Sequence, residues 1–181
     1  SRQRVMYATS KDGYKWSKAK NMTDIIAEKA YTPCGFWVRD GELFALASLK
    51  NSRASKLTSD NMVMKAYKWN ADKSDFEFSV NVVSNFSSVE GPRQLADGQW
   101  FMFGKPLPGA TPSDLTIQYA KGGKDAIDAW TIKSLPNDKI EHDIFWYTLP
   151  DGNLLSVEAT RQIPGRKLAT MYSNDQGDSW S

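Results

Sequence analysis

The sequence predicts an all-β fold, and three observations lead to this prediction. The 181 residues include 7 Trp, 7 Tyr and 8 Phe, which favour strands, together with 12 Gly and 8 Pro, which favour turns. Three Asp-Gly pairs each stand between two short apolar runs, a pattern typical of β-hairpins. Apart from a single helical turn expected at 23–29, no segment has the amphipathic period of a helix. We therefore expect more than about 40% of the residues in antiparallel strands.

The Asp-Gly hairpins mark an internal repeat of about 55 residues, within the range of repeat architectures such as propellers. They stand 57 and 54 positions apart, at Asp40-Gly41, Asp97-Gly98 and Asp151-Gly152. Between the first two, the alternating segment 62–69 and the segment 76–83 supply a second strand pair, with 70–75 as its turn. Each repeat thus holds four short antiparallel strands, which we name A to D in chain order.

Four antiparallel strands per repeat are the unit of a β-propeller blade. The sequence therefore predicts a single partial propeller domain over residues 1–181, with complete blades at 34–83 and 86–135 and blade remnants at 1–20 and 140–181. This makes about three and a half blades, which we interpret as part of a six- or seven-bladed propeller. Because proteins avoid open sheet edges, we expect the rest of a parent chain or a second chain to complete it.

Composition and charge exclude several function classes. The 23 basic and 21 acidic residues are scattered along the chain, so no basic stripe is expected to bind nucleic acid. No apolar run approaches the roughly 18 residues of a membrane-spanning helix, and we expect no membrane span. The single Cys34 and the single His142 cannot form a disulfide, a Cys-based zinc site or a multi-His metal site. We expect neither a metal nor another cofactor.

A polar turn motif recurs between the hairpins. Residues 173–180 read Ser-Asn-Asp-Gln-Gly-Asp-Ser-Trp and match the Asp-box, S-x-D-x-G-x-x-W, while residues 10–16 form a version one residue shorter. Residues 119–130 are a degenerate version of the same unit. In such a turn the Ser and Asp oxygens accept hydrogen bonds from backbone amides, Gly takes a positive φ, and Trp packs over the hairpin. The motif therefore predicts a structural turn rather than a site.

With these boxes and the repeat, the whole chain resembles the Asp-box, or BNR-repeat, propellers of the sialidase superfamily. The resemblance implies a site around the central axis, on the rim where the A strands start and the B strands end. The repeat places the A-strand starts at 32–35, 89–93 and 141–143. On this basis the candidate catalytic residues are Glu90, Glu141, His142, Asp143 and Glu158, and the candidate substrate-binding residues are Arg93, Arg161 and Arg53.

The candidate residues leave two chemical alternatives open. His142 titrates near neutral pH and could form an acid/base pair with a neighbouring carboxylate, but strand alternation would put only Glu141 and Asp143 on one side. Glu90 and Arg93 could contact substrate or could simply pair with each other. The planar fork of arginine suits a carboxylate, and the resemblance implies that Arg161 clamps the acid group of a sugar, with Arg93 as a second clamp.

These observations favour a sialidase-like glycoside hydrolase, or a segment of one, that acts on a terminal acidic or deoxy sugar of a glycan. Two carboxylates or a His–carboxylate pair would carry the acid/base chemistry. The alternative is a non-catalytic carbohydrate-binding or scaffold propeller. The resemblance also implies an extracellular or periplasmic location.

Overall fold

The fold is all-β. The computed structural model describes residues 3–51, 62–86, 88–104, 116–136, 140–160 and 168–181. Strands hold 58% of these residues, and none of them is helical, which confirms the predicted fold class. A helix that could cross a membrane is accordingly not found in the described ranges. The expected helical turn at 23–29 is wrong, because this segment has only a hydrogen-bonded turn just before a strand.

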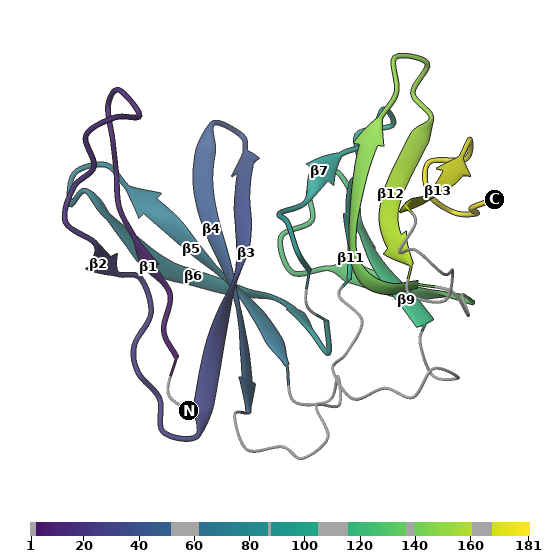
Figure 1. Cartoon of the computed structure of the whole chain (residues 1–181). Helices are drawn as coiled ribbons and strands as arrows, with labels where there is room; N and C mark the ends of the chain where they lie inside the picture. The colour runs from purple at the N-terminus through teal and green to yellow at the C-terminus, as the bar shows by residue number, and fades with distance from the viewer. Residues whose placement is uncertain (1–2, 52–61, 87, 105–115, 137–139, 161–167) are drawn as a thin grey trace.

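The described strands form four antiparallel sheets, which we number I to IV in chain order (Figure 1). Sheet I contains β1 (Met6–Tyr7) and β2 (Lys20–Asn21). Sheet II contains β3 (Lys29–Arg39), β4 (Glu42–Asn51), β5 (Val63–Asn70) and β6 (Asp75–Ser84). Sheet III contains β7 (Arg93–Gln94), β8 (Trp100–Phe103), β9 (Thr116–Gly122) and β10 (Trp130–Pro136). Sheet IV contains β11 (Ile140–Thr148), β12 (Leu154–Thr160) and β13 (Leu168–Ser173).

All three predicted Asp-Gly hairpins are present, but they are of two kinds. Asp40 and Gly41 both have positive φ, 52° and 76°, as a two-residue type I′ turn requires. At the other two turns only Gly98 and Gly152 have positive φ, both 84°. The loops there are one residue longer and are closed by backbone hydrogen bonds of 2.7 Å from residue 95 to residue 99 and from residue 149 to residue 153.

Consecutive sheets pack face to face through three apolar cores. The first core lies between sheets I and II, the second between II and III, and the third between III and IV. Strand β4 shows why: Phe44 and Leu46 belong to the second core while Ala45 and Ala47 belong to the first. Because alternate residues of a strand point to opposite faces, its continuous apolar run supplies both neighbours at once.

The Asp-box at 10–16 is the turn device that the sequence predicts. The Ser10 hydroxyl oxygen accepts a hydrogen bond of 2.8 Å from the backbone amide of Gly13. Asp12 Oδ1 accepts bonds of 2.9 Å from the amides of Tyr14 and Lys15. All of these donors and acceptors lie within residues 10–15, so the turn is held by local hydrogen bonds.

The Asp-box at 173–180 repeats this arrangement. Ser173 Oγ accepts a 2.9 Å hydrogen bond from the amide of Gly177, and Asp175 Oδ1 accepts one of 2.9 Å from the amide of Ser179. The hydroxyl of Ser179 donates to the other carboxylate oxygen at 2.5 Å. Both boxes are therefore confirmed as structural turns.

The tryptophan that ends each box makes one recurring hydrogen bond. The indole Nε1 of Trp16, Trp130 and Trp180 donates to the carbonyl oxygen three residues earlier, in each case at 3.1 Å. The bond at Trp130 confirms that residues 119–130 are a degenerate copy of the unit. We call these three residues the box tryptophans.

Two of the box tryptophans pack onto the sheet that precedes their own in the chain. The Trp130 ring lies 5.9 Å from the ring of Trp37 in sheet II, and the Trp180 ring lies 5.0 Å from that of Phe103 in sheet III. Trp16 is different, because its ring is 63% exposed. Its indole still folds back to its own turn, as predicted, and sheet I has no described sheet before it.

The second box should make stability depend on pH below about 4. Hydrogen bonds from Ser179 lower the pKa of Asp175 from 3.8 to about 2. A pKa below the unfolded value stabilises the fold above that unfolded value, and this stabilisation is lost as the pH falls toward 2. We expect Asp175→Asn to be less stable than the parent at pH 6, with a difference that narrows toward pH 2 in urea denaturation. Asp72→Asn, at an exposed turn, is the control, and a difference that stays constant with pH would contradict the assignment.

Candidate functional site

The first strands of sheets II, III and IV come together, and we call β3, β7 and β11 the inner strands. Each is an edge strand of its sheet. Gly91, just before β7, touches the backbone of β3, since a methyl group added to Gly91 would lie 1.9 Å from the carbonyl oxygen of Phe36. Two residues later, Arg93 Nη1 donates a 2.5 Å hydrogen bond to the carbonyl oxygen of Trp146 in β11. Segment 90–93 is therefore the place where the three inner strands meet.

Each inner strand is irregular at the segment that the repeat predicts as an A-strand start. The pairing register shifts at 34–35 in β3 and at 141–143 in β11. Before β7, residues 89–92 lie between the bridge that pairs Ser88 with Gly104 and the pair formed by Arg93 and Phe101. Bulges of this kind leave backbone groups unpaired, redirect side chains and are frequent beside functional sites. The predicted site segments thus share one structural feature.

Glu90 and Arg93 form an ion pair at this junction. Arg93 Nη2 donates to Glu90 Oε2, and the two side chains are 40% exposed for arginine and 19% for glutamate. The Arg93 guanidinium also lies against two rings of β11, with Cζ 5.5 Å from the centre of Trp146 and 5.3 Å from that of Tyr147. The structure therefore confirms the pairing of Glu90 with Arg93 that the sequence left open.

The Glu90 carboxyl group has an unusual environment for a glutamate. Burial raises its pKa above the ordinary value, while Arg93 and the backbone amide of Trp146 partly oppose this shift. Its second oxygen, Oε1, is buried and has no hydrogen-bond partner among the described residues. A carboxyl group with a raised pKa beside a positive charge is a candidate for acid/base chemistry.

Four further candidates are placed by their backbone alone. Glu141, His142 and Asp143 lie in β11 and Glu158 lies in β12, and their side chains fall outside the described part of the structure. The register pairs residue 144 with Glu158, so all four belong to one end of sheet IV. The sequence argument put Glu141 and Asp143 on one side of the strand because side chains alternate along it. The register shift at 141–143 interrupts this alternation.

The two remaining candidates, Arg53 and Arg161, lie outside the described residues. Their contribution to a carboxylate clamp stays a prediction. The structure therefore brings together Glu90 and Arg93 and places the backbone of the four sheet IV candidates near one another.

Sequence reasoning missed the exposed ring of Tyr147 beside the pair. Trp146 is fully buried and Tyr147 is 54% exposed, as alternation along β11 requires. The exposure of Tyr147 is therefore a direct consequence of the burial of its neighbour Trp146.

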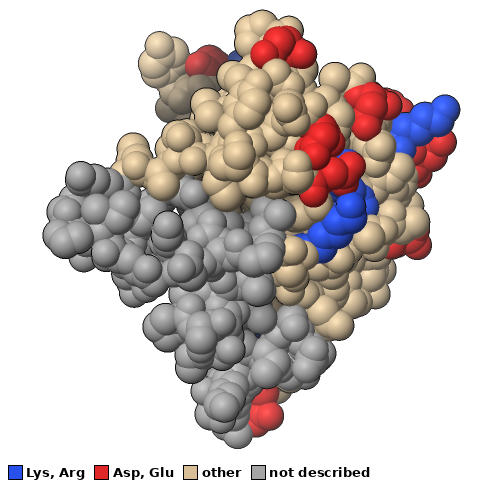
Figure 2. All heavy atoms as spheres, turned by 90° about the vertical axis from the view of Figure 1, so that its right-hand side faces the viewer, with Lys and Arg blue, Asp and Glu red and all other residues tan. Residues whose placement is uncertain are grey.

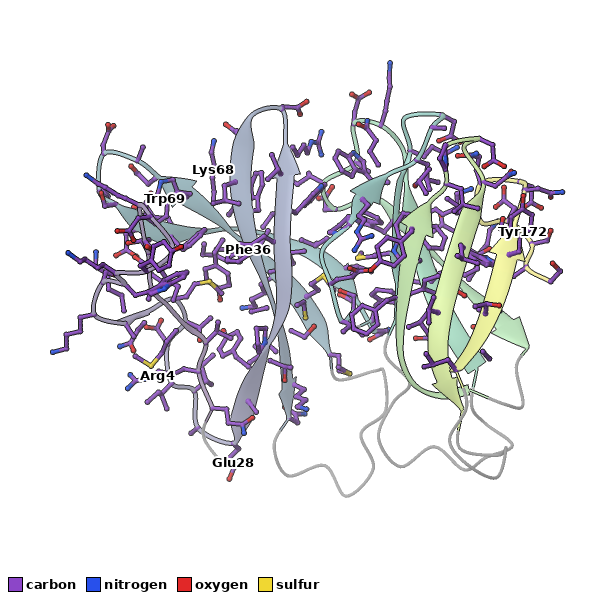
Figure 3. All side chains as sticks on the ribbon, turned by 45° about the horizontal axis from the view of Figure 1, so that its top comes forward. Arg4, Glu28, Phe36, Lys68, Trp69 and Tyr172 are labelled. Carbon is purple, nitrogen blue, oxygen red and sulfur yellow. The ribbon has the colours of Figure 1, made fainter. Side chains whose placement is uncertain are left out.

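Hollows of the described surface lie elsewhere. Two of them, of about 400 and 540 Å³, share Trp69 as a lining residue, and Trp69 stands with Lys68 at the end of the β5 strand (Figure 3). Neither is lined by Glu90 or Arg93. We therefore place the candidate site at the inner strands on chemical grounds and not by the size of a hollow.

Charge and metal-ligating groups can be compared only over the described part of the surface. On the face shown in Figure 2, basic side chains lie beside acidic ones. No cluster of three or more His, Cys, Asp or Glu side chains that could hold a metal occurs among the described residues. Comparison with protein-family models finds no match, and comparison with curated proteins finds none either. Functional inference therefore rests on the residues at the inner strands.

The close contact at Gly91 should make this position intolerant of a side chain. We expect Gly91→Ala to lower the free energy of unfolding by about 3 kcal/mol, because the added methyl group would overlap the β3 backbone. Gly123→Ala is the matched control, since nothing lies within 4 Å of a methyl group there, and it should change stability by less than about 0.5 kcal/mol. Equal stability of the two variants in chemical denaturation would show that the contact is absent.

The ion pair should hold the Glu90 pKa below the value that burial alone would impose. We expect Arg93→Met to raise this pKa further, because the charge that favours the ionised carboxylate is lost. Carboxyl ¹³C NMR titration measures the change directly. Lys124→Met removes an exposed positive charge elsewhere and should leave Glu90 unaffected. A pKa that falls or stays constant in Arg93→Met would rule out the pairing.

Proposed function

We propose that the chain belongs to a sialidase-like β-propeller glycoside hydrolase acting on a terminal acidic or deoxy sugar of a glycan. The observation that carries this proposal is the Glu90 carboxyl group, which has a raised pKa, a free oxygen and a charged partner at the meeting point of the inner strands. Glycosidases need a carboxylic acid of this kind to protonate the leaving oxygen. An extracellular or periplasmic location belongs to the same proposal.

The packing of the sheets supports the propeller architecture. Two sheets have four strands in simple antiparallel order, and successive sheets stack face to face with their first strands together. Trp130 packs sheet III onto sheet II, and Trp180 packs sheet IV onto sheet III in the same way. A radial array of such blades around a central axis repeats these contacts.

In the proposed reaction Glu90 donates its proton to the glycosidic oxygen while the bond from that oxygen to the anomeric carbon breaks. The departing part of the glycan leaves as an alcohol, and a water molecule supplies the hydroxyl group of the released sugar and the proton that restores Glu90. A second carboxylate from Glu141, Asp143 or Glu158, or the His142 imidazole, would assist at the anomeric carbon. Arg53, Arg93 and Arg161 are the candidates for binding an acidic group of the sugar.

One observation favours the alternative of a non-catalytic carbohydrate-binding or scaffold propeller. Arg93 already bonds to Glu90 and to the carbonyl oxygen of Trp146, so the pair also joins sheets III and IV. A purely structural role would need nothing more. Catalysis by Glu90 and a structural role for Arg93 are nevertheless compatible, because Glu90 Oε1 remains free.

Hydrolysis assays with the full chain separate these functions. With alkyl glycosides of acidic and deoxy sugars, whose departing alcohol must be protonated, we expect turnover that falls by at least about a hundredfold in kcat for Glu90→Gln, with little change in KM. Glu77→Gln, at an exposed carboxylate paired with Lys73, is the control and should keep full activity. Glycan binding without turnover would support the non-catalytic alternative, and full activity of Glu90→Gln would refute the catalytic assignment.

A further inference from the structure

Sheet IV has a large apolar face that is mostly exposed, and Arg93 contacts it only at one edge, at the ring of Tyr147. The register places alternate residues of its three strands on this side, and we call them the outer face: Phe145, Tyr147, Leu155, Val157, Leu168 and Tyr172. Four of the six are 38–73% exposed, and the other two are half-buried. On the opposite side of the same strands, Ile144 and Leu154 are fully buried against sheet III. A contiguous exposed apolar patch on a sheet marks an interaction surface.

The corresponding faces of sheets II and III show what covers such a surface. On sheet II, Trp37 is covered by sheet III, with the Trp100 ring at 5.3 Å and the box tryptophan Trp130 at 5.9 Å. On sheet III, Phe103 is covered by the box tryptophan Trp180 of sheet IV at 5.0 Å. In both cases the covering group is another sheet with a box tryptophan at its turn. The outer face of sheet IV requires a partner of the same kind.

The chain carries that partner surface at its other end. Trp16 makes the same hydrogen bond to the carbonyl oxygen three residues earlier as the other box tryptophans, yet it is 63% exposed. Met6 of β1 is 47% exposed, whereas its neighbour Tyr7 packs toward sheet II. We call Met6 and Trp16 the Trp16 face. It has the group that covers the equivalent surfaces of sheets II and III.

We propose that the outer face of sheet IV binds the Trp16 face of a second copy of this chain. The argument rests on the two contacts between sheets within the chain and is independent of the proposed glycosidase activity. Because one surface of each copy contacts a different surface of the next, the contact is head-to-tail and either closes into a ring or continues into a longer assembly. In a solution of this chain alone, a second copy is the molecule that offers an exposed box tryptophan.

Sedimentation velocity of two complementary variants tests the proposal. Trp16→Ala removes the covering ring and leaves the outer face intact, while Val157→Lys places a charge on the outer face and leaves Trp16 intact. We expect the parent chain to self-associate with rising concentration and each variant alone to be a monomer. An equimolar mixture should form a dimer, because the outer face of Trp16→Ala can bind the Trp16 face of Val157→Lys. The dimer should not grow, because its other two surfaces are both altered. If circular dichroism shows that Val157→Lys does not fold, Phe145→Lys replaces it, because Phe145 lies on the neighbouring strand and is more exposed than Val157.

Two matched controls guard against general effects of the substitutions. Tyr14→Ala changes a 91% exposed ring in the same box, and Phe78→Lys adds a charge at a 56% exposed position of β6. Both should associate within about twofold of the parent affinity. A parent chain that stays monomeric at about 100 µM would overturn the proposal. A mixture of the two variants that does not dimerise would also overturn it. Self-association of Trp16→Ala would overturn it too, because it would indicate contact between two outer faces.

Discussion

The whole structure depends on the need to cover both faces of each sheet with apolar side chains. Strand β4 shows this requirement most clearly, since its alternate residues supply the cores on its two sides and six consecutive positions, 44–49, are buried. A sheet with two apolar faces is stable only between two neighbours, because exposed apolar area costs free energy in water. The stacking of sheets in chain order follows from this constraint.

The position of the candidate site is a consequence of the same stacking. Face-to-face packing brings the inner strands so close that only glycine fits at position 91, and the Glu90–Arg93 ion pair lies beside this contact. Glu90 is half-buried at this junction, and its partial burial raises its pKa. Arg93 bonds to the backbone of the next sheet, so the local electrostatics depend on how sheets III and IV pack.

Much of the fold could be predicted from local sequence, because turns are local structures. The Asp-Gly hairpins and the boxes depend on residues within a few positions of one another, and even the degenerate unit that ends at Trp130 was identified. The helical turn at 23–29 was wrong because tertiary contacts decide that segment: Thr23 is buried and its hydroxyl accepts a hydrogen bond from the amide of Val5. The repeat located segment 89–93, but not the bond from Arg93 to a carbonyl of another sheet, which no side-chain pattern encodes.

The recurring contact between a box tryptophan and the preceding sheet makes the described structure a linear array. Its apolar clusters join neighbouring sheets in the described part of the chain, so stability approximates a sum of terms for each sheet and each interface. Two interfaces stabilise each of sheets II and III, whereas a single interface stabilises each of sheets I and IV. Fluctuations that open the fold should therefore begin at the two ends and reach the inner sheets last. The junction at Glu90 and Gly91, between sheets II and III, then belongs to the most slowly opening part of the molecule.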